Sequence, residues 1–227
     1  SRVRSKPLPL ASTGTSTVLS MTDCEFGSNG GDGIDLGSGS PVSIVITRCS
    51  IHDNTGNGIV GTAVSPDVSV RDSIVDSNAL TGVAASVAEL SGNTIYGNTG
   101  ATTDGVATQN SNASTLASYH GNIFDTNARY GFNRQGSSNR PFFGDYNYYH
   151  ANGAAERNNL AAGAHDDIAT DPGFTNAAGA DFSIGTALRA AWSRTFPGSS
   201  TITYRDPGAV QRQETSGGGC STSSSGR

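Results

Sequence analysis

Apolar and polar residues follow one another in a repeating order along this 227-residue chain. In each of six units an apolar residue is followed three positions later by Asn, and in the first five units a Gly-apolar pair comes within seven more residues. Successive Asn residues are 25, 24, 20, 29 and 25 positions apart. A period of this size indicates a solenoid. The repeated residues are Asn29, Asn54, Asn78, Asn98, Asn127 and Asn152.

Short stretches of alternating apolar and polar residues lie within each unit, for example at 43–47 and 68–71. Period two with turn residues between the stretches is typical of β-strands. About 24 residues are too few for a strand, a crossover helix and a returning strand, which need about 30 or more. We therefore predict an all-β fold, a parallel β-helix in which each turn has three short strands and three bends. Each strand would pair with its equivalent one turn above.

Equivalent residues of successive turns stack in columns in such a fold, and three columns are apolar. We predict that they form the core. The first contains Met21, Ile46, Val70, Leu90 and Tyr119, the second Phe26, Ile51, Val75, Ile95, Phe124 and Tyr149, and the third Ile34, Ile59, Val83, Val106 and Phe132.

The repeated Asn residues form a column of their own. A polar residue inside a core needs a hydrogen-bond partner, so we predict a structural ladder in which each amide bonds the local backbone and the Asn of the next turn. The repeated Gly residues either adopt a bend with positive φ or let neighbouring turns approach closely. These are Gly33, Gly58, Gly82, Gly105 and Gly131.

The recurring motif of the Asn-x-x-Gly-x-Gly-Ile type resembles that of right-handed parallel β-helix proteins of the pectate-lyase-like superfamily, over about residues 17–153. The resemblance implies the fold. That group includes polysaccharide lyases, glycoside hydrolases, epimerases, adhesins and virus tail or capsid-surface proteins, so the resemblance does not select an activity.

The chain divides into four parts by composition. We expect an N-terminal arm at 1–16, a β-helix of about six coils at 17–153, a capping segment at 154–213 and a Ser/Gly-rich tail at 214–227. Solenoids need atypical terminal units to cover the last core layer. The apolar residues expected to do so are Phe174, Phe182, Ile184, Leu188, Trp192 and Phe196.

Composition excludes several classes of function. Charged residues make up 15% of the chain and the net charge is −5, so there is no basic face for nucleic acid. No run reaches the roughly 18 apolar residues of a spanning helix. We find no phosphate-binding loop, nucleophile elbow or paired-Cys zinc motif, and expect no cofactor and no metal. Cys24 and Cys49 occupy equivalent positions and are expected to be stacked interior thiols, whereas Cys220 lies in the tail.

One outward column, which directly follows the Gly-apolar pairs, is small and mostly apolar. It lacks the carboxylate cluster that binds calcium in pectate lyases and the Arg or Lys that they use as a base, which counts against a lyase. A flat surface of this kind can pack against a copy of itself. The predicted interface residues are Val60, Ala84 and Ala107.

A second outward column holds the only titratable row, which runs from His52 to His150. Asp76 and Asp125 lie two turns apart in it, about 9.6 Å by the strand spacing, at the upper edge of the carboxylate separation in inverting glycosidases. Tyr96 between them offers a ring on which a sugar could stack. In one interpretation the two carboxyls are acid and base, with the two His residues in support. In the other they are solvated polar residues.

Aromatic residues cluster at 142–149 and include Tyr146, which offers a second carbohydrate platform, a protein contact or a closure of the core. Our leading hypothesis is a non-catalytic structural or adhesive subunit of a larger assembly, such as a virion surface, tail or fibre component. We expect self-association or other subunits as partners, and an extracellular or virion-surface location. The alternatives are a polysaccharide-degrading glycoside hydrolase or lyase and a glycan-binding adhesin.

Overall fold

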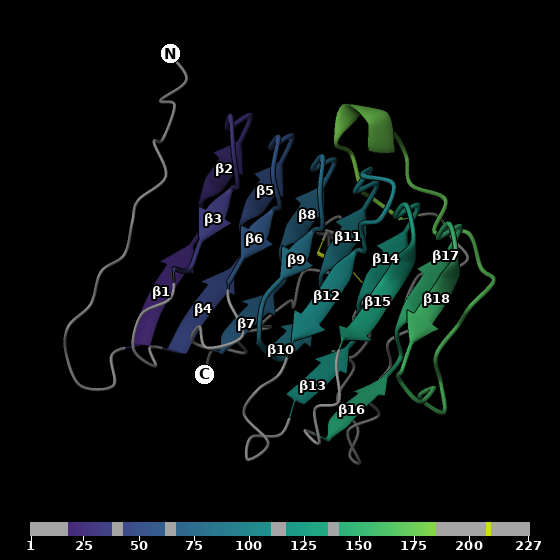
Figure 1. Ribbon diagram of the computed structural model, residues 1–227. Coiled ribbons are helices and arrows are strands. Elements are labelled where there is room, and N and C mark those ends of the chain that lie inside the picture. The colour runs from purple at the N-terminus through teal and green to yellow at the C-terminus, as the bar shows by residue number, and fades with distance from the viewer. Residues whose placement is uncertain are drawn as a thin grey trace, which may run out of the picture.

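The computed structural model describes residues 18–37, 43–61, 67–109, 117–135, 141–184 and 208–209. In these ranges the chain forms three parallel sheets of six strands each (Figure 1). Sheet A contains β1 (Val18–Thr22), β4 (Ser43–Thr47), β7 (Val68–Arg71), β10 (Val87–Ser91), β13 (Ala117–His120) and β16 (Phe142–Asp145). Sheet B contains β2 (Glu25–Gly27), β5 (Ser50–His52), β8 (Ile74–Asp76), β11 (Thr94–Tyr96), β14 (Ile123–Asp125) and β17 (Tyr148–His150). Sheet C contains β3 (Ile34–Asp35), β6 (Ile59–Val60), β9 (Val83–Ala84), β12 (Val106–Gln109), β15 (Tyr130–Gln135) and β18 (Ala155–Asn158).

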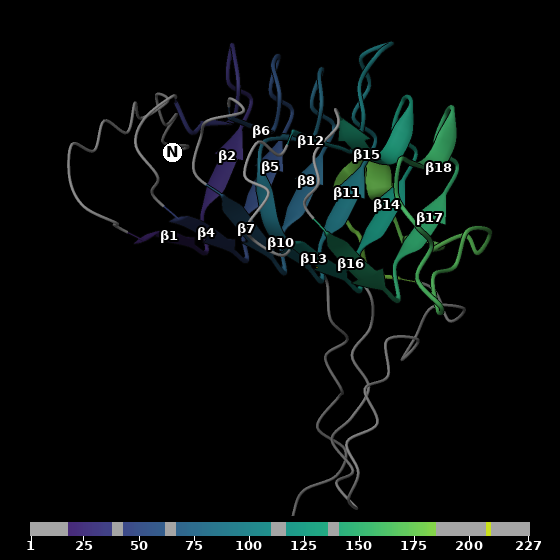
Figure 2. The same cartoon turned by 60° about the horizontal axis from the view of Figure 1, so that its bottom comes forward.

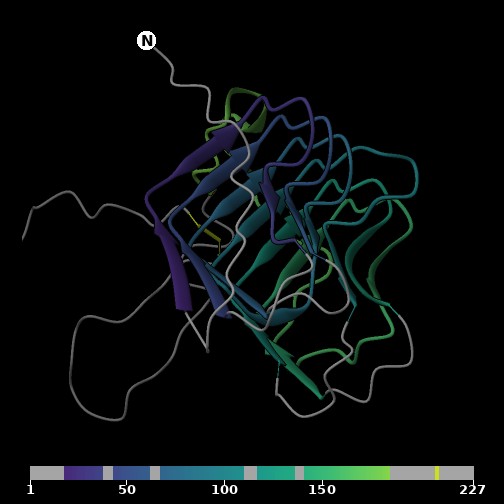
Figure 3. The ribbon, with the colours of Figure 1, turned by 60° about the vertical axis from the view of Figure 1, so that its left-hand side comes forward.

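Each turn of the chain contributes one strand to each sheet, so the strands stack along an axis, as Figures 2 and 3 show from two further sides. This confirms the predicted all-β parallel β-helix of about six coils. The last turn is completed by β18, which pairs with β15 and lies beyond residue 153, where the sequence placed the end of the repeat.

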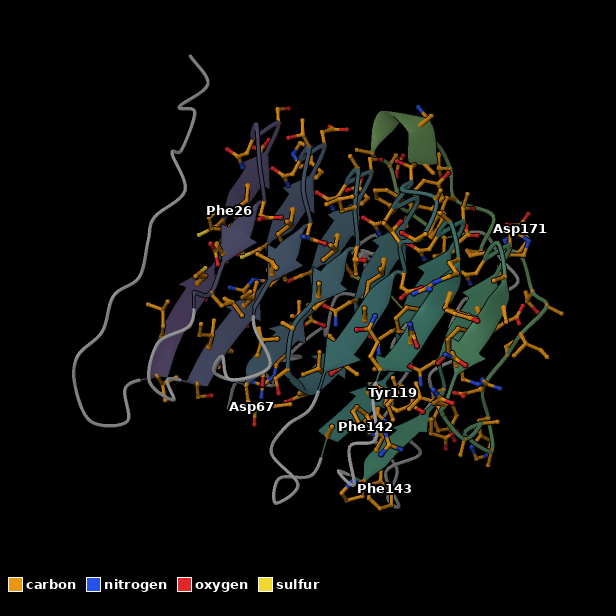
Figure 4. The ribbon with its side chains drawn as sticks, viewed as in Figure 1. Phe26, Asp67, Tyr119, Phe142, Phe143 and Asp171 are labelled. Carbon is orange, nitrogen blue, oxygen red and sulfur yellow. The ribbon has the colours of Figure 1, made fainter. Side chains whose placement is uncertain are left out.

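The three predicted apolar columns are confirmed by the strand register and fill the interior. In sheet B, for example, Phe26 pairs with Ile51, and the pairing continues through Val75, Ile95 and Phe124 to Tyr149. From the second turn onward these column members are buried, whereas Phe26 at the first turn is only partly buried. Figure 4 shows Phe26 at one end of the stack.

Two sharp bends in each turn use a single residue in the left-handed conformation. One bend follows sheet A and the other follows sheet B. Gly, Asn and Asp tolerate this conformation best, because a Cβ there crowds the following carbonyl. The bend after sheet A uses Asp23, Arg48, Asp72, Gly92, Gly121 and Tyr146, and the bend after sheet B uses Ser28, Asp53, Ser77, Gly97, Thr126 and Ala151.

The five repeated Gly residues do not adopt positive φ. Their role is the second of the two that the sequence left open, namely close approach between turns. A Cβ built on Gly58 would lie 2.6 Å from the carbonyl oxygen of Gly82 and 2.9 Å from Nδ2 of Asn78. A side chain at this position would therefore push neighbouring turns apart.

The predicted Asn ladder is present along the bend after sheet B. Successive side-chain amides donate from Nδ2 to Oδ1 of the next turn, over distances of 2.8, 2.8, 3.1, 2.9 and 3.0 Å from Asn29 to Asn152. From the second turn onward the same Nδ2 also donates to a strand carbonyl of the turn before, as Asn54 does to Phe26. Each interior amide is thus fully bonded, which removes the cost of burying it.

A second ladder lies along the bend after sheet A and was not predicted. Asn93 donates to Asn122 and Asn122 to Asn147, over 3.0 and 2.9 Å. At the end of the stack Asn147 donates to Asp166, over 3.2 Å. This ladder is not recognisable in the sequence, because its column begins with Cys24, Cys49 and Ser73 before Asn appears.

The segment after β18 has two parts with different positions. Asp167 pairs with the last turn, since Tyr149 N donates to its carbonyl over 2.8 Å, and Leu160 packs against the core. Residues 171–184, which include the short 3-10 helix η1 (Ala177–Gly179), return along the stack instead and reach β11.

The prediction that Phe174, Phe182 and Ile184 cover the last core layer is wrong. The two Phe rings pack on Tyr96 and Ile184 packs with Ile123 and Tyr148, all on the outer face of sheet B. Outward apolar and aromatic side chains of sheet B thus offer the returning segment a surface on which to pack. Leu188, Trp192 and Phe196, the arm at 1–16 and the tail at 214–227 lie outside the described residues.

Candidate functional site

The titratable row predicted on sheet B is assembled by the strand register. Gly27 pairs with His52, His52 with Asp76, Asp76 with Tyr96, Tyr96 with Asp125 and Asp125 with His150. Inward residues such as Ile95 alternate with them along each strand, so the row lies on the outer face of the sheet.

Tyr96, in the middle of this row, packs against the returning segment at residues 171–184. The ring of Phe182 meets Tyr96 edge-on with centroids 5.3 Å apart, and Phe174 does so at 5.8 Å. Asp76 is 5% exposed and Asp125 4%. The two carboxyls are therefore buried in this conformation, and the ring proposed as a sugar platform between them is half-buried.

Asp125 makes the contacts expected of a positioned carboxylate. Its Oδ1 lies 2.9 Å from Nδ1 of His150 and accepts from Oγ1 of Thr126 over 2.8 Å. Burial raises the pKa of Asp125 above its usual value, and the hydrogen bonds from Thr126 and His150 partly oppose the shift. Asp171 adds a like charge that raises it further.

Asp76 is the most perturbed carboxyl of the row. Burial raises the pKa of Asp76 to about 6, although a hydrogen bond from Ser77 and the charge of His52 act in the opposite direction. A carboxyl with such a pKa is about half protonated near pH 6, which is the property needed of a general acid.

His52 supports Asp76 less directly than His150 supports Asp125. Its Nδ1 lies 2.9 Å from Oδ2 of Asp53 and its Nε2 lies 3.1 Å from Oε1 of Glu25. Burial lowers the pKa of His52, but these two carboxylates and the charge of Asp76 raise it overall. Both ring nitrogens are thus directed away from the centre of the row.

The comparisons with known proteins bear on the fold. A family model described as "Right handed beta helix region" matches residues 11–154, which is more than half of the chain. The chain belongs to the right-handed β-helix family. Searches of curated proteins and of solved structures gave no significant match.

The small-apolar column of this β-helix protein lies on the outer face of sheet C. Val60 and Ala84 are half-buried, but Ala107 is only 5% exposed. The expectation of a flat contact surface through Ala107 is therefore corrected: within the chain itself this residue is already covered.

An ion pair near this column was missed by the sequence analysis. Arg129 donates to the 1% exposed carboxylate of Asp104 through Nε and Nη2, over 2.8 and 2.7 Å, and Asn133 donates to it over 2.8 Å. Both oxygens of the buried carboxylate are thus occupied, which compensates for its loss of hydration. The two partners are 25 positions apart, and only the register brings them together.

Tyr146 directly follows β16, the last strand of sheet A, and its side chain packs against His165. Its ring is stacked on His165, with centroids 4.5 Å apart and an interplanar angle of 5°. Asp145 accepts from the backbone N of His165 over 2.7 Å and contacts its Nδ1 at 2.8 Å. These bonds from His165 hold the pKa of Asp145 below its usual value against burial. The sequence did not predict this pair, because His165 lies past the end of the repeat.

The acidic run near His165 has structural partners. Asp166 accepts from Arg157 over 3.0 Å, and Asp167 accepts from the backbone N of Ala169 and Thr170 over 2.9 Å each. Within the described ranges, no three His, Cys, Asp or Glu side chains gather in a way that could hold a metal ion. The same part of the chain contains no helix able to span a membrane.

Proposed function

We propose that this β-helix protein is a non-catalytic structural or adhesive subunit of a larger assembly, of the virion-surface, tail or fibre type. One observation carries the proposal: in the titratable row predicted from the sequence, Tyr96 packs against Phe174 and Phe182, and the carboxyls of Asp76 and Asp125 are buried. We propose an extracellular or virion-surface location, with copies of the chain or other subunits as partners.

The coverage of the row argues against catalysis in this conformation. An acid or base acts on a substrate at hydrogen-bond distance or through one water. Asp76 and Asp125 are 5% and 4% exposed, and the ring of Tyr96 between them contacts two Phe rings. A sugar ring could not meet either carboxyl before the groups that bury it had moved.

The stacked sheets supply a rigid body suited to a subunit. Three ladders of backbone hydrogen bonds and two of Asn side chains run along its axis. Val60 and Ala84 on sheet C remain half-exposed and small enough for a second chain to approach closely. We propose this part of sheet C as the contact surface.

The oligomeric state tests the proposal. Light scattering and electron microscopy should show a discrete trimer or higher assembly, and Ala84→Arg should weaken it because a long charged side chain enters the contact. The matched control is Ser20→Arg on the exposed face of sheet A, which should leave the assembly intact. A dilute monomer that degrades glycans contradicts the proposal.

A polysaccharide-degrading enzyme is the second candidate, and the raised pKa of Asp76, about 6, favours it. Asp76 would act as the acid and Asp125 as the base, once the covering segment moves away. Depolymerisation of a glycan panel should then increase in Phe182→Ala and vanish when Asp76→Asn or Asp125→Asn is added. Activity that is unchanged in both Asn variants removes this candidate.

A glycan-binding adhesin without catalysis is the third candidate, and the stack of Tyr146 on His165 favours it. Aromatic rings present a flat apolar face with a polar edge, which suits a sugar. Binding on a glycan array should be lost in Tyr146→Ala and retained in Phe143→Ala, which removes another ring of the same strand region. Equal binding by both variants excludes Tyr146 as the platform.

A further inference from the structure

Two cysteines lie side by side at equivalent positions in the first two described turns of the solenoid. Thr22 pairs with Thr47 before them and Glu25 with Ser50 after them, so Cys24 lies opposite Cys49. Adjacent strands are about 4.8 Å apart. This spacing falls within the Cα separation of roughly 4.4 to 6.8 Å that disulfides span.

The two thiols point in the same direction from this bend. Sγ of Cys24 lies 3.3 Å from the carbonyl oxygen of Thr22, and Sγ of Cys49 lies 3.4 Å from that of Thr47. Sγ of Cys49 also reaches back to the carbonyl oxygen of Met21 in the first turn, at 3.8 Å. The inner thiol thus already lies between the two turns.

The residues directly before the cysteines hold the two turns together. Arg48 donates to both carboxylate oxygens of Asp23, over 2.7 and 2.8 Å. Cys49 is buried, whereas Cys24 in the first described turn is partly exposed. An oxidant in solution therefore reaches Cys24 first.

We propose that Cys24 and Cys49 are a redox-active pair that closes into a disulfide and staples the first turn to the second. The oxidant is a low-molecular-weight disulfide. The thiolate of Cys24 attacks it, forms a mixed disulfide and releases one small thiol. The thiolate of Cys49 then attacks the sulfur of Cys24 and releases the second small thiol. Two protein thiols are oxidised and one small disulfide is reduced to two thiols, with the protons passing to those thiols.

The staple acts on the first turn that the structure describes. Each turn contacts only its neighbours, so a terminal turn opens more readily than an interior one. A disulfide here closes a loop of about 25 residues and restricts the opened state. The inference does not depend on the proposed function, although an extracellular location is one in which such a bond persists.

Oxidation of the whole chain tests the proposal, in a Cys220→Ser background that removes the third thiol. After incubation with oxidised glutathione, mass spectrometry of the denatured protein should show single chains about 2 Da lighter, whose cysteines resist iodoacetamide. Its melting temperature should rise by about 5 to 10 °C. Amide hydrogen exchange in β1 and β2 should slow, and a thiol reductant should reverse all three changes.

Cys24→Ser and Cys49→Ser in the same background are the matched controls. Ser73 occupies the next turn of this column and donates to the carbonyl of Arg71 over 2.7 Å, so Ser fits the site. Neither control should gain stability on oxidation. A persistent glutathione adduct, disulfide-linked dimers or two alkylated cysteines in the oxidised sample each overturn the proposal.

Discussion

The ring of Phe182 contacts the ring of Tyr96 at a centroid distance of 5.3 Å, although the two residues belong to different parts of the chain. Tyr96 belongs to the repeat and Phe182 to the segment that follows it. Phe182 is 1% exposed and also packs on Phe174. The contact holds residues 171–184 against sheet B and covers part of Tyr96, whereas His52 and His150 keep 23% and 30% of their side-chain surface exposed.

Phe182→Ala should release this segment while the solenoid stays folded. The loss of a buried Phe ring costs about 3 kcal/mol or more, and the segment can detach without opening the turns. The population of the detached state should rise roughly a hundredfold. Limited proteolysis and hydrogen exchange at 171–184 measure this change. Phe143→Ala is the control, since that ring is 57% exposed and its loss should have little effect.

Asp76 should make stability depend on pH. Its pKa is raised from 3.8 to about 6 by burial, so the folded state keeps a proton that the unfolded state has lost in this window. The contribution of this proton to the free energy of unfolding is fully present below pH 3.8. It decreases as the pH rises and is lost above about pH 6. The full loss in free energy of unfolding is roughly 3 kcal/mol.

Asp76→Asn isolates this contribution. The variant should be more stable than the natural chain at pH 7 and similar to it near pH 4, as measured by urea unfolding across about pH 4 to 8. Asp35→Asn changes an exposed carboxyl and should not alter the difference. A natural chain whose stability rises between about pH 4 and 6 relative to Asp76→Asn contradicts the raised pKa.

The fold could be predicted because the repeat specifies the register. Once the period is known, every position has a column, and Phe26 through Tyr149 follow it without exception. The second Asn ladder was missed because the column changes residue type from Cys49 to Ser73 to Asn93. A polar column of mixed composition does not repeat one residue type, so it cannot be recognised as a repeat in the sequence.

The candidate site could be predicted only in part. The register placed Asp125 beside His150, as the 2.9 Å contact shows. The sequence could not predict that Phe174 and Phe182 cover Tyr96, because the returning segment has no period and its position depends on long-range packing. The stack of Tyr146 on His165 has the same origin.

Asn78→Ala tests the interior of the Asn ladder. Its amide donates to Oδ1 of Asn98 over 3.1 Å and to the carbonyl of Ile51 over 3.2 Å, and accepts from Asn54 over 2.8 Å. Ala leaves these buried groups without partners, at a cost of about 2 to 4 kcal/mol in free energy of unfolding. Asn29→Ala at the partly buried start of the ladder should cost clearly less in the same urea titration. Equal losses would show that burial of the amide is not what matters.

Gly58→Ala tests whether the repeated Gly residues are required for close approach. The added Cβ would lie 2.6 Å from the carbonyl oxygen of Gly82 and 2.8 Å from Cγ1 of Val75, both in the next turn. Neither group can move away without lengthening hydrogen bonds between the strands. We therefore expect a loss of about 1 to 3 kcal/mol in free energy of unfolding. Gly30→Ala is the matched control, because a Cβ there meets nothing within 4 Å. Chemical unfolding of the two variants separates the explanations: a general helix or strand preference for Ala over Gly acts alike at both sites, whereas crowding acts only at Gly58. If Gly58→Ala is as stable as Gly30→Ala, the spacing between turns does not depend on this Gly.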